Sequence, residues 1–142
     1  MKLKKLPRII ILFLLILNGC GAIFAGYCFI REPNGSLIGM DKSILVHSPF
    51  KDFLIPGIIL FVFNGLSSLI VLWQLLRNAT HLGYFLFIQG ILSCGWIVVQ
   101  MIMLRSFNIL QVIFGLIGFV FFATGYFLLK RNLTNRKGNF NE

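Results

Sequence analysis

Four long hydrophobic runs alternate with short polar segments along the chain, and each run predicts a membrane-spanning helix. The runs cover residues 9–30, 49–76, 82–104 and 109–129. A spanning helix needs about 20 apolar residues, because each residue adds about 1.5 Å and the apolar core of a bilayer is about 30 Å thick. The pattern therefore predicts an all-α membrane protein with four transmembrane helices.

The segments between the runs leave no room for a soluble domain. Residues 77–81 and 105–108 are short connections, which make the second, third and fourth spans antiparallel neighbours. An outside loop at residues 31–48 and a basic tail at residues 130–142 account for most of the remainder. We expect a single transmembrane domain over residues 1–142, folded as an antiparallel bundle.

Composition supports this reading. Hydrophobic residues make up 58% of the chain and charged residues 12%, whereas roughly a quarter of a soluble domain is charged. The net charge is +9, but the basic residues flank the hydrophobic runs, as membrane topology requires. We therefore expect the lipid bilayer, and not nucleic acid, as the main partner, with a further membrane protein or a second copy of the chain as an open possibility.

The basic residues also predict an orientation. Lys2, Lys4, Lys5, Arg8, Arg77, Lys130, Arg131, Arg136 and Lys137 lie on one predicted side, and Arg31, Lys42, Lys51 and Arg105 on the other. Because basic residues favour the cytoplasmic side, both termini are expected in the cytoplasm and residues 31–57 outside. The expected location is the plasma or inner membrane of the cell.

The segment between the first two spans is the most distinctive part of the chain. Residues 37–46 are largely apolar but are interrupted by charged and small residues, so they predict a short interfacial or re-entrant element. Ser48 and Pro49 predict the start of the second helix, with Ser48 as N-cap and Asp52 in the first turn. Pro56 is expected to kink this helix.

Two groups of polar residues are candidates for a site. The first is an outer group at the loop: Asp41, His47, Ser48 and Asp52. It has no metal-ligand spacing and no catalytic pattern, so no metal, cofactor or catalytic residue is predicted. These residues are either solvated interface residues with a helix cap, or an outward-facing site.

The second group lies within the spans and consists of Asn18, Asn64, Gln89 and Gln100. Such amides either link helices by hydrogen bonds or line a polar pocket that opens outward. The span cores carry no Asp, Glu, Lys, Arg or His, which argues against a proton- or ion-coupled transporter.

The first span allows a second interpretation. Basic residues precede it, and Leu17 to Cys20 resembles a lipoprotein cleavage box. The apolar run continues to Ile30, however, beyond the length of a signal-peptide core, so a retained helix is favoured. The three cysteines are expected to be structural thiols, because they form no Cys-x-x-Cys pair.

Several short motifs resemble a family of uncharacterised small four-helix bacterial membrane proteins. They are the GSxxGM pattern at 35–40, SPFxDFLIPG at 48–57, Asn64-Gly65 and WIxxQ at 96–100. The resemblance implies an integral membrane location and four spans, and it implies no activity.

The sequence favours a non-enzymatic role, as a structural, accessory or partner-binding component of the membrane. The alternative is a protein that handles a small molecule or a lipid, with an outward-facing pocket beneath residues 31–57. A polar-lined cavity that includes Asn18, Asn64 and Gln100 would favour the alternative, and a dry, closed bundle would favour the first role.

Overall fold

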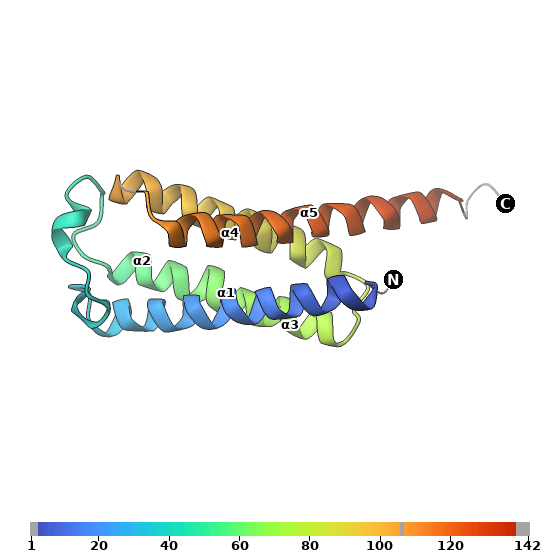
Figure 1. Ribbon diagram of the computed structural model, residues 1–142, viewed down its shortest axis with the longest axis horizontal. Coiled ribbons are helices and arrows are strands. Elements are labelled where there is room, and N and C mark those ends of the chain that lie inside the picture. Colours follow the sequence, from blue (N-terminus) through green and yellow to red (C-terminus); the bar gives the residue numbers. More distant parts are fainter. Residues whose placement is uncertain (1–2, 106, 139–142) are drawn as a thin grey trace.

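The computed structural model describes residues 3–105 and 107–138, with side chains as far as residue 134, and its regular elements are all helices (Figure 1). Four helical segments are long and apolar enough to cross a membrane. They are α1 (Lys5–Arg31), a second segment (Leu54–Leu76), α4 (Leu82–Leu104) and α5 (Ile109–Gly138). They pack against one another, so the predicted four-helix membrane bundle is confirmed.

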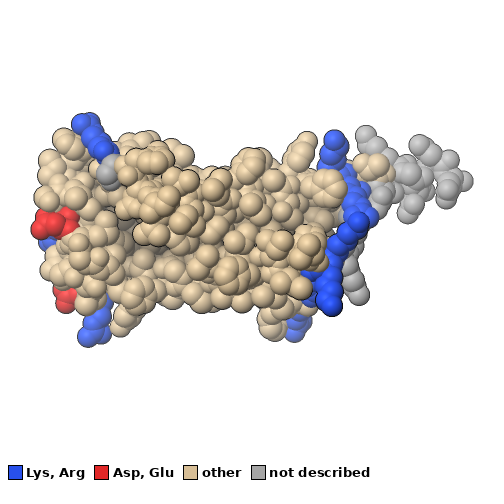
Figure 2. All heavy atoms as spheres, in the orientation of Figure 1, with Lys and Arg blue, Asp and Glu red and all other residues tan. Residues whose placement is uncertain are grey.

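The bundle has two different ends. At the loop end, residues 32–53 form a cap over the helices (Figure 1). At the basic end lie the N-terminus, the connection 77–81 and the last turns of α5. Figure 2 shows Lys and Arg at both ends, with acidic side chains visible only at the loop end and a long uncharged middle. Such an uncharged band is what a lipid-facing surface requires.

The second spanning segment begins five residues later than the sequence predicts. Its first helix, α2, covers Leu54–Ile59 with Phe53 as N-cap, and Ser48 instead accepts a hydrogen bond from the Phe50 N–H at 3.2 Å. The prediction of Ser48 as the helix cap is therefore wrong. Asp52 lies one residue before the N-cap and not in the first turn as predicted, but its carboxylate accepts the N–H of Leu54, the first residue of α2, at 3.0 Å. Serine followed by proline suits a turn as well as a helix start.

This segment is also not a regular helix. After α2 comes η3, a π-helix over Leu60–Leu66, and then α3 over Ser67–Leu76. Pro56 lies in the first turn of α2, where its missing N–H removes no intrahelical bond, so the expected kink at Pro56 is wrong. The irregularity lies in the wider turns of η3, and π-helical turns occur often at functional sites.

The last helix continues beyond its predicted end at residue 129. α5 reaches Gly138 and projects past the other helices at the basic end (Figure 1). Residues 130–137 are polar and basic but contain no proline or glycine. Basic residues also favour the negative end of the helix dipole, so a helix can leave the membrane here without interruption.

Residues 32–53 fold back over the helix ends. They contain two short 3₁₀ helices, η1 (Ser36–Ile38) and η2 (Lys42–Leu45), which are too short to span a membrane, as predicted. Leu45 and Phe53 are buried. The Phe53 ring stacks on Phe29 of α1 with 4.7 Å between the ring centroids, so the loop is attached to the bundle by apolar contacts.

Close packing at glycines divides the four spans into two pairs. In the first pair, a Cβ on Gly26 of α1 would lie 2.7 Å from Cβ of Phe61. In the second, a Cβ on Gly125 of α5 would lie 2.3 Å from the backbone nitrogen of Phe87 on α4. Each pair therefore has backbones in close contact, an arrangement that small residues permit within membranes.

The larger of two apolar clusters that join the pairs lies toward the basic end. That core contains buried residues of every span: Ile11, Leu15, Val71, Leu75, Leu82, Leu86, Ile117, Phe121 and Leu128. A second, smaller cluster lies at the loop end and includes Ala22, Phe29, Leu45, Phe53, Leu60 and Met103. Between the pairs, next to this second cluster, the packing is interrupted by a cavity.

Candidate functional site: a cavity beneath the loop

A cavity of about 520 Å³ lies between the two helix pairs in the half of the bundle nearest the loop. All four spans and the loop contribute to its wall. The cavity extends from Asn18 and Asn64, deep in the bundle, to the loop. At the loop it is lined by Ile38, Met40 and Ile44. A cavity of this size can hold a drug-sized molecule.

One face of α4 supplies much of the polar wall. Ser93, Trp96, Gln100 and Met103 follow one another at intervals of three or four residues and all line the cavity. This spacing places them on one side of an α-helix. α4 therefore presents a hydroxyl, an indole and an amide in succession toward the loop.

The loop closes the cavity from above. Phe53 lines it while its own backbone N–H donates to the Pro33 carbonyl at 2.9 Å. The stacked ring of Phe29 lies beside it, and Met40 packs against the same apolar cluster. The closure is thus made of apolar side chains, which can move without breaking an ion pair.

The start of α5 forms the side of the cavity opposite α1. A Cβ built on Gly21 of α1 would lie 3.5 Å from Phe114 of α5, an ordinary contact distance. Gly21 therefore faces the cavity. Asn108 and Gln111 form a reciprocal cap at the start of α5: Asn108 accepts the Leu110 N–H at 3.2 Å, and Gln111 accepts the Asn108 N–H at 3.0 Å.

A chain of hydrogen bonds begins at the deep end of the cavity, where Asn64 and Ser93 line the wall, and continues away from it. Ser67 donates to Gln89 Oε1 at 2.7 Å, Gln89 Nε2 donates to Ser93 at 3.3 Å, and Ser93 donates to Asn64 Oδ1 at 3.0 Å. The chain joins the second span to α4. Each interhelical bond of this kind within a membrane stabilises by roughly 0.6–1.7 kcal/mol.

Two N–H donors in the cavity wall have no hydrogen-bond partner among the described residues. They are Asn64 Nδ2 and Trp96 Nε1, and both nitrogens are covered by neighbouring atoms of the wall. A buried donor without a partner costs about 1–3 kcal/mol. Both nitrogens are covered in the structure, so an acceptor in the cavity would remove this cost only if the two side chains rotate to expose them.

The other two predicted intramembrane residues have different surroundings. Asn18 is buried and its Nδ2 donates to Ser68 at 2.9 Å, which links α1 to α3. Gln100 is half-buried in the cavity wall, and its amide has no hydrogen-bond partner in the part of the chain that the structure describes. Of the four predicted residues, Gln89 serves mainly to link helices, while Asn18, Asn64 and Gln100 also line the cavity.

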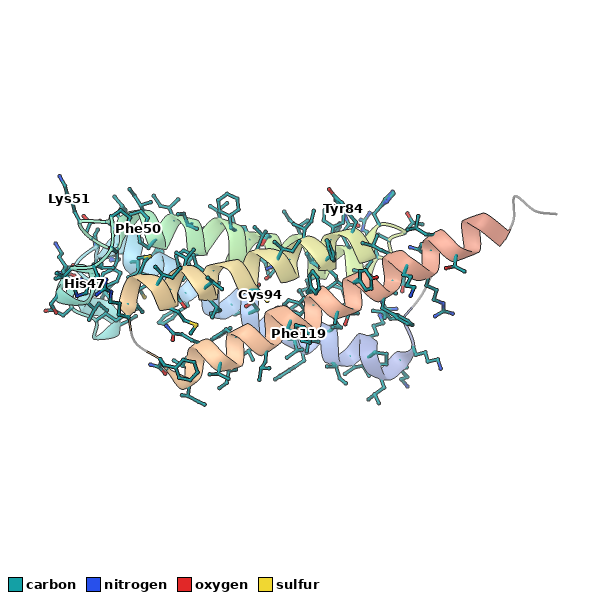
Figure 3. All side chains as sticks on the ribbon, turned by 90° about the horizontal axis from the view of Figure 1, so that it is seen from above. His47, Phe50, Lys51, Tyr84, Cys94 and Phe119 are labelled. Atoms are coloured by element: carbon teal, nitrogen blue, oxygen red, sulfur yellow. The ribbon has the colours of Figure 1, made fainter. Side chains whose placement is uncertain are left out.

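The outer candidate residues bind mainly their own neighbouring backbone. Asp41 accepts the Ser43 N–H at 2.7 Å, and Ser48 and Asp52 each bind the backbone two residues further on. The hydrogen bonds from the backbone and side chain of Ser43 lower the pKa of Asp41. His47 is exposed at the loop end (Figure 3). No three His, Cys, Asp or Glu side chains within the described ranges are grouped to hold a metal.

The cysteines are separate thiols in the described structure. Cys20 is exposed on the lipid-facing side of α1, and Cys28 is buried near its end. Cys94 lies in the middle of the bundle (Figure 3), and its thiol donates weakly to the Gly115 carbonyl at 3.8 Å. The expected packing role therefore fits Cys28 and Cys94 but not the exposed Cys20.

The chemistry of the cavity follows from its wall. Most lining side chains are apolar, and the described residues of the wall include no Asp, Glu, Lys, Arg or His. A charged molecule would lose its hydration there without gaining a counter-charge. An uncharged, largely apolar molecule with a hydrogen-bond acceptor matches the wall better.

Sequence reasoning did not select Trp96 or Gln111 as site residues. The spacing of Ser93, Trp96 and Gln100 was a readable signal, since it places them on one helix face. Asn108 and Gln111, three residues apart before an apolar run, were a readable capping signal.

Comparison of the chain with protein-family models, with curated proteins and with solved structures finds no match. The role of the cavity has therefore to be argued from its own geometry.

Proposed function

We propose that this protein is a binding protein for a small, uncharged and largely apolar molecule, held within the membrane in the cavity beneath residues 31–57. The observation that supports this proposal best is the cavity itself, which has Asn18, Asn64 and Gln100 in its wall. Protein interiors are normally close-packed, so a cavity of this size between helices is expected to hold a bound molecule.

The polar atoms of the wall support a particular kind of ligand. Trp96 Nε1 can only donate a hydrogen bond, and it lacks an acceptor among the described residues. Asn64 Nδ2 is in the same situation, one end of a hydrogen-bond chain that the protein itself does not complete. A carbonyl or ester oxygen would satisfy either group, so the proposed ligand carries such an acceptor on an apolar body.

The proposal includes an orientation. The basic end would face the cytoplasm and the loop end would face outward, in the plasma membrane, because nine of the 13 basic residues belong to the side with the termini. A ligand would then enter from the outer leaflet or the outer surface. The loop residues Met40 and Phe53 would be the groups that it displaces first.

Photolabelling with benzophenone tests the proposal. This ketone is uncharged and reacts with nearby C–H bonds on irradiation, so a bound molecule marks its own site. We expect labelled peptides from α1 and α4 around Ala25 and Ile97, which both line the cavity. The variant Ala25→Phe, which fills the cavity, should lose most of this label. Val98→Phe is the matched control, because Val98 lies on α4 and its side chain is 54% exposed.

Two results would count against binding. The first is label spread over lipid-facing residues with none at the cavity wall. The second is equal labelling of Ala25→Phe and the parent protein, with both variants unfolding at the temperature of the parent. Either result would favour the other role considered for this chain, a structural or accessory component of the membrane whose cavity is a packing defect.

A further inference from the structure

A second opening lies at the opposite end of the molecule. It is a groove of about 640 Å³ between the start of α1 and the last membrane-embedded turns of α5. It is separate from the cavity beneath the loop, since the two have no lining residue in common.

The groove combines an apolar floor with two basic residues. Leu3, Pro7, Ala123, Phe127 and Leu128 provide an apolar floor. Lys4 and Arg131 line the same groove, and both residues are exposed. Neither side chain has a hydrogen bond or an ion pair with another described residue. An apolar groove with cations beside it matches a molecule that has an apolar chain and an anionic head.

The charge around the groove favours an anion. Lys5 and Arg8 at the start of α1, Arg77 after α3 and Lys130 near the end of α5 lie at the same end of the bundle as Lys4 and Arg131. The acidic residues that the structure describes, Glu32, Asp41 and Asp52, belong to the loop end (Figure 2). The described part of the basic end therefore contains cations without acidic partners.

The position of the groove fits the depth of a lipid headgroup. On α5 the apolar run ends at Leu129, and Lys130 and Arg131 follow at once. On α1 the apolar run begins after Arg8, and Lys4 precedes the helix. The two cations of the groove thus lie where hydrocarbon gives way to headgroups, and basic pockets between helices at this depth are suited to anionic lipids.

We propose that this groove is a binding site for an anionic phospholipid of the surrounding leaflet. Lys4 and Arg131 bind the phosphate, and one acyl chain lies along Leu3, Pro7 and Phe127. The proposal is independent of the ligand in the cavity, because it uses other residues and another chemistry.

Native mass spectrometry of the purified protein tests this site with two lipids that share their acyl chains. Dioleoylphosphatidylglycerol is anionic and dioleoylphosphatidylcholine is zwitterionic. We expect the first lipid to bind about five- to tenfold more tightly. The double variant Lys4→Gln/Arg131→Gln should reduce this ratio to about one. Lys5→Gln/Lys130→Gln is the charge-matched control, since neither residue lines the groove, and it should keep the preference.

A third variant tests whether lipid binding needs the shape of the groove or only the positive charge of the basic end. Ala123→Trp fills the apolar floor and leaves both cations in place, so it should weaken binding of the anionic lipid several-fold. Equal affinity for the two lipids would refute the site. Equal loss of preference in the two double variants would also refute it, because the preference would then come from the basic end as a whole. Unchanged binding by Ala123→Trp would refute the role of the groove.

Discussion

The guanidinium group of Arg8 on α1 binds the side-chain oxygen of Asn78, which follows α3. Its other terminal nitrogen donates to the carbonyl of Leu75 at 3.2 Å and lies 3.3 Å from that of Leu76. Asn78 has a positive φ of 51°, and the Ala79 N–H donates to the Gln74 carbonyl, as in a Schellman cap. The Leu75 carbonyl also accepts the Asn78 N–H at 3.2 Å, so Arg8 adds a second donor to a capped helix end and places a cation at the negative end of that helix.

This contact predicts that Arg8→Gln destabilises the protein by about 1.5–3 kcal/mol, the range for hydrogen bonds that involve a charged group. Chemical unfolding of the purified protein in detergent measures the change in free energy. Lys5→Gln removes one positive charge from the same helix end without removing a hydrogen bond, so it should change stability by less than about 0.5 kcal/mol. Equal effects of the two variants would show that net charge, and not the cap, is what matters.

The glycine contact between α4 and α5 predicts a second stability effect. Gly125→Ala places a methyl group against the backbone nitrogen of Phe87, where the calculated separation is 2.3 Å. The helices must then move apart, and such overpacking costs about 1–3 kcal/mol.

Gly95→Ala is the matched control for Gly125→Ala, because a Cβ at Gly95 of α4 meets no atom within 4 Å. Alanine forms helices more readily than glycine, so this variant should be neutral or more stable by up to about 1 kcal/mol. Thermal unfolding in detergent compares the two. If Gly125→Ala unfolds at the same temperature as Gly95→Ala, the backbones of α4 and α5 are not in close contact at Gly125.

The unpaired donors of the cavity predict a preference for ligands with a carbonyl group. Fluorenone and fluorene have the same ring system and differ by one carbonyl oxygen. Fluorenone should compete with benzophenone labelling at about tenfold lower concentration than fluorene, since one or two hydrogen bonds contribute about 0.5–1.5 kcal/mol each.

Trp96→Phe and Asn64→Leu should each reduce the preference for fluorenone several-fold, whereas Met103→Leu, an apolar exchange in the same wall, should not change it. If fluorene and fluorenone compete equally while the label stays at the cavity, the protein binds its ligand without these donors. Loss of all cavity labelling would instead contradict the proposed function itself.

The proposed orientation predicts which side of the membrane each connection faces. Single cysteines at Ser36 and Thr80, two exposed positions at opposite ends of the bundle, provide the test in a chain without its native cysteines. A membrane-impermeant maleimide added to intact cells should label Ser36→Cys and not Thr80→Cys. Labelling of Thr80→Cys alone would mean that the termini face outward.

The number and position of the spans could be predicted because hydropathy over about 20 residues depends on composition alone. The exact start of the second helix could not, because Ser48-Pro49 fits a turn and a helix cap equally well. The same limit applies at the end of α5. Nothing in residues 130–137 stops a helix, so the end of the hydrophobic run did not mark the end of the helix.

The candidate site could be predicted only in part. Asn18, Asn64 and Gln100 were selected because amides are costly in a membrane, and all three line the cavity. Which helices pack closely depends on which glycine meets which backbone, as at Gly125 and Phe87, and a single sequence does not contain that pairing. Without it, neither the division into two pairs nor the space between them can be derived.

The bundle is expected to open from its loop end, because the larger core that all four spans share lies toward the basic end. Local unfolding begins where few buried contacts must be broken. Near the basic end, opening would separate Leu15, Leu86 and Phe121, which are fully buried. At the loop end the buried cluster is smaller and lies beside the cavity, so fewer buried contacts hold the helix pairs together. Backbone amides there should exchange with solvent deuterium sooner than those near Phe121, and the two pairs would open from the loop while the opposite end stays joined.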